Sequence, residues 1–333
     1  MSEISVGAAV GAGFDLIGKR PLSVLFWGLL RVGFVAGIVL LYLPLIFGFI
    51  VQARQAEASG GDASPAAVGQ MMSHMLVMQG MGFLVQIVGL FVSSMIYCAV
   101  IRAVVHPEQR SFGSVRLGAP ELYLVVLSFA LGFVIAFALI LCLIPFMIVV
   151  GLLAANHQWL AMGIVIGLGV LVLVLGAILV ALRFAFVAPM MVDDGKFHLF
   201  ESWTLTKGRV GSLFAIGLLL VLITLLIEIV LGLLFVGLAL GALILAAGGF
   251  SNIPGFFQAH ASDPAALIPI LAPSLILLAV LLIPVEGAFL AIFIAPWAKA
   301  YRDVVPPPVA AQPPSPPPAP VEPPPSGPAP VVA

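Results

Sequence analysis

The placement of basic residues between long apolar stretches constrains this chain most strongly. Six apolar stretches run through residues 22–299, and the links between them alternate between several Lys and Arg residues and almost none. Most of the thirteen bases fall before the first stretch, in the second and fourth links, and after the last stretch: Lys19, Arg20, Arg102, Arg110, Arg116, Lys196, Lys207, Arg209, Lys299 and Arg302. The first, third and fifth links hold only Arg54. Because Lys and Arg concentrate in cytoplasmic loops, the pattern predicts six membrane spans with both termini in the cytoplasm.

Composition also indicates a membrane protein. The chain is 62% hydrophobic and 8% charged, whereas a soluble domain averages about 25% charged residues. No alternating apolar and polar barrel pattern occurs, so the spans are expected to be helices that satisfy their backbone groups internally. The net charge of −1 gives no indication of a nucleic-acid partner.

The boundaries of the spans follow from length and polarity. No Asp, Glu, Lys or Arg occurs between Glu121 and Arg183, which is too long for one span of about 20 residues. The only polar cluster in that stretch, residues 155–159, is therefore expected to be a turn. The predicted spans are 23–51, 76–101, 122–153, 160–191, 212–246 and 266–297. They form a membrane domain over residues 1–304, followed by a Pro-rich tail, 305–333, expected to be disordered and partly polyproline II.

We predict that one unit occurs three times along the chain, which would give an all-α fold of three helical hairpins. Each unit would hold a cytoplasmic amphipathic segment, a span outward and a span back. The segments are 13–26, 111–126 and 199–214, and each has Phe or Leu at helical spacing, a basic residue, and then Pro or Gly. Internal repeats are common in membrane proteins, and binding sites often form between them.

The amphipathic segments are expected to lie in the membrane interface, with their bases towards lipid phosphates. In the third segment we predict a helix over 197–207. Phe197, Phe200 and Trp203 would form its apolar face, and Lys207 and Arg209 would be its bases. Asp194 would cap its start and Gly208 would end it. The alternative is an ordinary link packed on the bundle. The acid pair Asp193 and Asp194 is expected to cap this helix and not to carry out acid-base chemistry.

Residues 189–209 read PMMVDDGKFHLFESWTLTKGR. This segment resembles part of the polytopic membrane domain found beside some bacterial glycerophosphodiester phosphodiesterases. The resemblance rests on Pro189, Gly195, Ser202, Leu205, Thr206, Gly208 and Arg209. In that family the phosphodiesterase activity belongs to a separate soluble barrel, so the resemblance implies a membrane module without that activity.

Four ionisable residues lie within predicted spans: Arg31, Arg183, Glu228 and Glu286. A buried charge in a membrane is costly unless it is paired, so such residues are functional candidates. At 1.5 Å per helical residue, the acids lie roughly 20–25 Å and the bases roughly 15 Å from the cytoplasmic edge. Three interpretations remain open. The four could form a structural ion-pair network, Glu228 and Glu286 could line a proton or cation path, or Arg31 and Arg183 could bind a lipid or anion headgroup.

Other motifs are less specific. Three Gly-x-x-x-Gly motifs (33–37, 163–167 and 237–241) favour helix packing within the chain or, alternatively, a dimer face. Cys98 and Cys142 are expected to pack as small apolar residues. No metal-binding His pair, Gly-rich phosphate loop or Gly-x-Ser-x-Gly elbow occurs, so the sequence predicts neither an enzyme nor a cofactor.

These observations predict a non-enzymatic protein of a bacterial inner membrane that organises lipid or protein partners. The Pro-rich tail would serve as a spacer or as a docking arm for a protein partner. The alternative is a small proton- or cation-coupled transporter or channel that uses Glu228 and Glu286.

Overall fold

The computed structural model describes residues 4–58, 65–108, 112–259 and 267–305, which contain helices and turns and no strand. Six helices are long: α2 (Pro21–Ala58), α3 (Pro65–Val105), α4 (Ala119–Ala155), α5 (Trp159–Arg183), α8 (Val210–Ala247) and α10 (Leu267–Val304). The shorter ones are α1 (Val6–Lys19), α6 (Val187–Asp194), α7 (Glu201–Leu205), α9 (Ile253–Ala259) and the 3₁₀ turns η1 (Phe112–Ser114) and η2 (Phe250–Asn252). The proposed tail lies outside the described residues from 306 onward.

The structure contains six segments that are long and apolar enough to cross a membrane, so the chain is a multi-pass membrane protein. They are Pro21–Val51, Gly69–Val105, Ala119–Ala155, Trp159–Asp194, Val210–Ala247 and Ala272–Val304. Each overlaps one predicted span. The polar turn expected at residues 155–159 is also present: α4 ends at Ala155, α5 begins at Trp159, and His157 has a positive φ of 55°.

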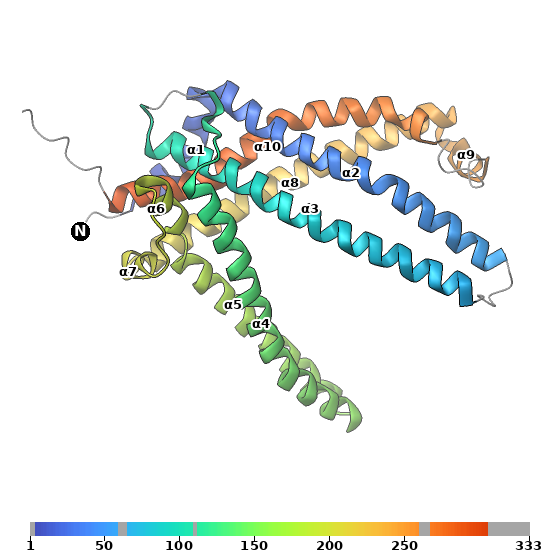
Figure 1. The fold of residues 1–333 in the computed structure, drawn as a ribbon, viewed down its shortest axis with the longest axis horizontal. Helices are drawn as coiled ribbons and strands as arrows, with labels where there is room; N and C mark the ends of the chain where they lie inside the picture. Colours follow the sequence, from blue (N-terminus) through green and yellow to red (C-terminus); the bar gives the residue numbers. More distant parts are fainter. Residues whose placement is uncertain (1–3, 59–64, 109–111, 260–266, 306–333) are drawn as a thin grey trace, which may run out of the picture.

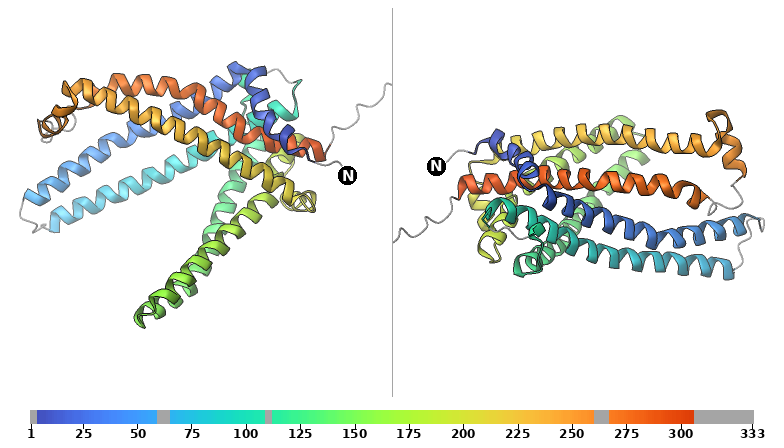
Figure 2. Two further views of the ribbon diagram at one scale, coloured as in Figure 1. Left: turned by 180° about the vertical axis from the view of Figure 1, so that it is seen from behind. Right: turned by 90° about the horizontal axis from the view of Figure 1, so that it is seen from above.

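The long helices meet at one end of the molecule and diverge towards the other (Figure 1). We call the end that holds α1, α6 and α7 the junction end. From there, α2, α3, α8 and α10 extend together in one direction, while the pair α4 and α5 leaves at a wide angle (Figures 1 and 2). The two members of this pair run side by side, as do α2 and α3. The helices therefore share one packed region, at the junction end.

The first and last spans approach each other closely through two glycines. A Cβ atom added to Gly28 of α2 would lie 1.9 Å from the carbonyl oxygen of Ile283, and one added to Gly287 of α10 would lie 2.0 Å from that of Val24. Such distances are far below van der Waals contact, so only glycine fits at either position. Small residues allow membrane helices to pack backbone against backbone in this way.

Helix α1 packs along α10 at the junction end. Its N-cap is Ser5, whose Oγ accepts a 3.4 Å hydrogen bond from the amide of Ala8. Ala9 and Leu16 are buried, and a Cβ added to Gly13 would lie 2.6 Å from the Cα of Ile292. The first expected interfacial segment, 13–26, is therefore divided between the end of α1, which is held against the last span, and the start of α2.

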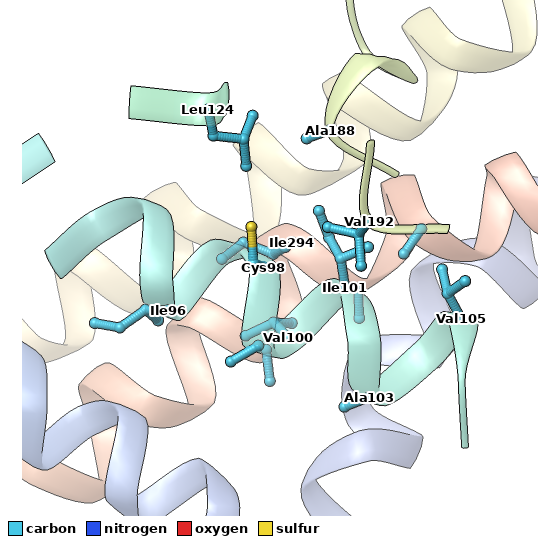
Figure 3. Close-up of a cluster of buried hydrophobic side chains, with 14 of the residues drawn as sticks. Ile96, Cys98, Val100, Ile101, Ala103, Val105, Leu124, Ala188, Val192 and Ile294 are labelled. Carbon is cyan, nitrogen blue, oxygen red and sulfur yellow. The ribbon is translucent and has the colours of Figure 1, made fainter. Parts of the chain in front are cut away.

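The described residues form two hydrophobic core clusters. One joins α1, α5, α8 and α10. The other lies where α3, α4, α6 and α10 meet (Figure 3), with further side chains from α1 and α2. Ile101 and Cys98 of α3 are fully buried there, beside Leu124 of α4 and Val192 of α6. Cys98 thus packs as a small apolar residue, as expected, whereas Cys142 is exposed on α4. Beyond the core, α4 and α5 expose almost all of their side chains, as spans surrounded by lipid would.

The packing expected at the three Gly-x-x-x-Gly motifs is not found within the chain. A Cβ added at any of their six glycines would meet no atom within 4 Å. Among the glycines of the α-helices, the closest contacts with another helix occur instead at Gly13, Gly28, Gly169 and Gly287, none of which belongs to a Gly-x-x-x-Gly motif.

The expectation of three similar amphipathic helices is also wrong. The second segment forms only η1 followed by residues without regular structure before α4, and the third contains only the short α7. The helix predicted over 197–207 is therefore limited to Glu201–Leu205. Asp194 ends α6 and does not begin α7, while Gly208 (φ 78°) lies in the turn before α8.

We predict that Gly28→Ala destabilises the protein by at least about 1–3 kcal/mol, because overpacking a closed contact forces the backbones apart. Gly37→Ala on the same helix is the matched control. Its added methyl group meets nothing, and Ala is favoured over Gly in a helix by about 1 kcal/mol. Thermal unfolding in detergent measures both variants. Equal midpoints for the two would contradict the close contact between α2 and α10.

Candidate functional site

The four ionisable residues predicted within the spans are not brought together. Nη1 of Arg31 donates to Oγ of Ser93 at 3.5 Å. Glu228 is exposed on α8, and Glu286 is half-buried on α10. Among the ion pairs of the described residues, none includes Arg31, Arg183 or either acid. The expected mutual neutralisation is therefore absent from this structure.

A buried ion pair occurs instead between Arg102 at the end of α3 and Glu121 at the start of α4. Their side chains are 3% and 1% exposed, and Nη2 of Arg102 lies 2.5 Å from Oε1 of Glu121. Nη1 of Arg102 also donates to the carbonyl oxygen of Ser114 at 2.6 Å. Sequence reasoning treated Arg102 as a topology signal and Glu121 as a span boundary. The only sign of this ion pair in the sequence is that the two residues have opposite charges and lie on either side of one short link.

The same link is bound to α2 through its backbone. Gly113 has a φ of 64°, and a Cβ there would lie 2.6 Å from Cδ1 of Phe26. The indole Nε1 of the fully buried Trp27 donates to the carbonyl oxygen of Gly113 at 2.7 Å. Glycine is thus required by both the left-handed backbone and the aromatic ring above it. The second link therefore holds the ends of α2, α3 and α4 together through these contacts.

A second polar cluster surrounds Asp193 at the end of α6. The hydroxyl of Tyr301 donates to Oδ2 of Asp193 at 3.0 Å. Nε2 of His106 and Nη2 of Arg302 each lie 3.6 Å from its Oδ1. Asp193 therefore joins the ends of α3, α6 and α10, and it does not cap the following helix as expected.

The fourth link is anchored at the break between α5 and α6. Ser202 of α7 is fully buried, and its Oγ donates to the carbonyl oxygen of Arg183 at 2.7 Å and accepts from the amide of Phe186 at 3.3 Å. These bonds satisfy backbone groups that the interrupted helix leaves open. Within the resembling segment, Ser202 is therefore a residue that fastens the link to the span.

The remaining acids of this link are bound to one histidine. Nε2 of His198 lies 2.5 Å from Oδ2 of Asp194, and Nδ1 contacts Oε2 of Glu201. Burial lowers the pKa of His198, but hydrogen bonds and charge from Asp194 and Glu201 outweigh it, so the pKa is raised above 6.5. Asp194 also accepts from the amide of Lys196 at 3.0 Å.

The bases around the fourth link have no such partners. Among the ion pairs of the described residues, none includes Arg183, Lys196, Lys207 or Arg209. Arg209 donates only to the carbonyl oxygen of Leu205, and Lys196 and Lys207 are exposed. These four bases are available to an external anion.

The aromatic residues predicted for this link are exposed beside those bases. Phe197, Phe200 and Trp203 are 49%, 74% and 46% exposed. Cζ of Arg183 lies 5.1 Å from the centre of the Trp203 ring, and Nη1 of Arg183 lies 3.5 Å from the Trp203 carbonyl oxygen. Exposed aromatic rings next to unpaired bases are typical of a membrane interface.

An apolar cavity of about 570 Å³ opens between α5 and α8 next to this link. Its walls come from α3, α5, α6, α8 and α10 and include Tyr97, Phe184, Phe214, Gly217 and Trp297. Another apolar cavity, of about 430 Å³, lies between α2 and α3 and is lined by Gly33 and Gly37. Neither cavity is lined by Glu228 or Glu286.

Comparisons with models of protein families, with curated proteins and with solved structures found no match. The resemblance of residues 189–209 to the phosphodiesterase-associated membrane domain therefore stays a prediction.

We predict that Glu121→Ala destabilises the protein by about 3–5 kcal/mol, because it leaves the Arg102 guanidinium buried without its counter-charge. Asp15→Ala is the control. It breaks the exposed pair with Lys19, a kind of pair that contributes about 0–1 kcal/mol. Unfolding in mixed micelles measures both. The double variant Arg102→Leu/Glu121→Leu should lose less stability than the sum of its single variants; additive losses would contradict direct coupling.

We predict that the order of the fourth link depends on pH through His198. A raised pKa means that the bonds of the imidazolium to Asp194 and Glu201 contribute fully below pH 6.5 and are lost as pH rises through the folded-state pKa. Amide protection factors for residues 196–206 should therefore fall as pH increases. The change should disappear in His198→Gln and persist in His157→Gln, a variant of the α4–α5 turn. Identical pH profiles for these two variants would contradict the prediction.

Proposed function

We propose that this protein is a non-enzymatic membrane module that organises anionic phospholipids in the cytoplasmic leaflet of a bacterial inner membrane. The observation that carries the proposal is the unequal pairing of charges at the fourth link. Its acids are used within the chain, by His198 for Asp194 and Glu201 and by Tyr301 and Arg302 for Asp193. Its bases are left without carboxylate partners.

Anionic lipid is the ligand that best fits this arrangement. Bases near the surface of an anionic membrane each contribute about 1 kcal/mol to binding, and exposed aromatic side chains insert at headgroup depth. Phe200 and Trp203 supply such aromatic side chains, and Lys207 and Arg209 supply bases in the same short segment. The anchoring of Ser202 at the break between α5 and α6 holds this segment against the spans.

The proposal includes an orientation in which the junction end faces the cytoplasm. The described bases of the second and fourth links and of both terminal segments belong to this end, as the positive-inside rule requires of cytoplasmic links. Three hairpins would then each begin at a basic link and return to the same side. The Pro-rich tail, 305–333, would project into the cytoplasm, where a protein partner could reach it.

Anionic lipid preference tests the function. In nanodiscs that contain phosphatidylglycerol and phosphatidylcholine, we expect the lipids around the wild-type protein to be enriched in phosphatidylglycerol. At about 1 kcal/mol per base, Lys207→Gln/Arg209→Gln should reduce this preference roughly thirtyfold. The control is Lys19→Gln/Asp15→Asn, which removes an exposed base already paired with an acid. Lipid mass spectrometry after exchange measures the preference. Equal preference in both variants would overturn the proposal.

A further inference from the structure

We infer that the cavity between α5 and α8 is a binding site for a single phospholipid, with one acyl chain in the cavity and the phosphate group at Arg183. The inference rests on the proposed lipid function and assigns it a defined site. The ligand is a phospholipid of the leaflet at the junction end, and the site is distinct from the general attraction of the fourth link for anionic headgroups.

The position of the cavity matches the depth of one leaflet. Its lining residues on α8 extend from Phe214 to Val221, and α8 begins at Val210. At 1.5 Å per residue, Val221 is roughly 17 Å along the helix from that start, about half of the 30 Å hydrocarbon thickness. On the opposite wall, Ile178 and Ala188 bracket the end of α5 and the start of α6. A chain that enters from the junction end would thus fill the cavity without crossing the midplane.

The walls of the cavity suit a hydrocarbon chain. They are apolar apart from the tips of Tyr97 and Trp297, and Ala181 and Gly217 leave room where larger side chains would close the gap. A volume of about 570 Å³ falls within the roughly 300–1,000 Å³ of ordinary ligand sites. An empty apolar space would forfeit dispersion contacts on all of its walls. A lipid chain is the apolar group that the surrounding membrane supplies.

The charge at the mouth indicates a phosphate group. Leu182 and Phe184 line the cavity and flank Arg183 in the sequence, and the ring of Phe184 meets Trp203 edge-on with centroids 6.2 Å apart. Arg183 stacks over the same Trp203 ring and has no carboxylate partner. Its one hydrogen bond, of 3.5 Å to the Trp203 carbonyl oxygen, uses a single guanidinium nitrogen. The remaining donors can bind a phosphate in the bidentate manner that arginine favours.

A cavity-filling variant tests the acyl-chain site. A Cβ added to Gly217 would lie 3.6 Å from Cη2 of Trp297, an ordinary contact, so a side chain can be placed here and will occupy the cavity. The matched control is Gly232→Leu on the same helix, where an added Cβ meets nothing and which does not line the cavity. The full chain is first delipidated with detergent and then incubated with phosphatidylglycerol or phosphatidylcholine. Native mass spectrometry measures how much of each lipid stays bound.

We expect the wild type and Gly232→Leu to retain one phospholipid and Gly217→Leu to lose at least tenfold in occupancy while melting at a similar temperature. A phosphatidylglycerol with a photoactivatable acyl chain should label α5 and α8 around the cavity. Retention of the lipid by Gly217→Leu, or labelling spread evenly over the exposed faces of α4 and α5, would overturn the site. So would a wild-type dimer that carries no lipid and dissociates in Gly217→Leu.

The phosphate contact is tested separately. Arg183→Gln should lower phosphatidylglycerol occupancy several-fold, and Arg183→Lys should restore only part of it, because lysine keeps the charge but not the bidentate geometry. Unchanged occupancy in Arg183→Gln would overturn the assignment of the phosphate to Arg183. Lys207→Gln/Arg209→Gln should leave the single retained lipid in place. If Gly217→Leu retains its lipid, the acyl-chain site is overturned but the proposed function is not. If the wild-type protein shows no preference for phosphatidylglycerol, the proposed function is overturned but the acyl-chain site is not.

Discussion

The backbone contact between α2 and α10 is the constraint on which the rest of the structure depends. Lipid tails are as apolar as the spans themselves, so no hydrophobic force drives one span against another, and association relies on close packing and polar contacts. Gly28 and Gly287 allow the first and last spans to meet at backbone distance. Helix α10 then also contacts α1, α3, α6 and α8, so one glycine crossing fixes the centre around which the other elements are arranged (Figure 2).

Polar contacts are concentrated at the junction end because charged groups are least costly near water. The Arg102–Glu121 pair, the Asp193 cluster and the His198 contacts all lie at the ends of spans or in the links. Towards the other end the helices diverge and present apolar side chains to lipid. The pair α4 and α5 is likewise held to the other elements by polar contacts at the junction end, those of Glu121 with Arg102 and of the Arg183 carbonyl with Ser202.

Hydropathy and length were sufficient to predict the six spans, because each span needs its own run of apolar residues and every turn needs polar ones. The position of the turn at Asn156 followed for the same reason. The pairing of charges could not be predicted, because it depends on how each helix is rotated about its axis. Glu228 lies on an exposed face of α8, and the sequence alone gives no rotation for a helix that is apolar on all sides.

Local glycine and charge patterns did not predict which helices pack together, for a related reason. Gly28 and Gly287 are about 260 residues apart, and their complementarity is a property of two helices and not of a short motif. Likewise, the link with Arg102 and Glu121 resembled a simple cytoplasmic loop, although Gly113 folds it back beneath Phe26 and Trp27. The aromatic residues of the fourth link and Lys207 are exposed, but the helix expected to carry them is only one short turn, and their place in the membrane interface stays a prediction.

Bases that look equivalent as topology signals therefore have different roles in the folded chain. Lys19, Arg102, Lys299 and Arg302 are each paired with an acid from this chain: Asp15, Glu121, Asp303 and Asp193, respectively. The fourth link also contains acids, but Asp194 and Glu201 are bound to His198 and Asp193 is bound to groups outside the link. Its own bases are consequently left without carboxylate partners, beside exposed aromatic rings and an apolar cavity. Under the proposed function, the bases that orient the chain during insertion also form, at the fourth link, a surface complementary to phospholipid.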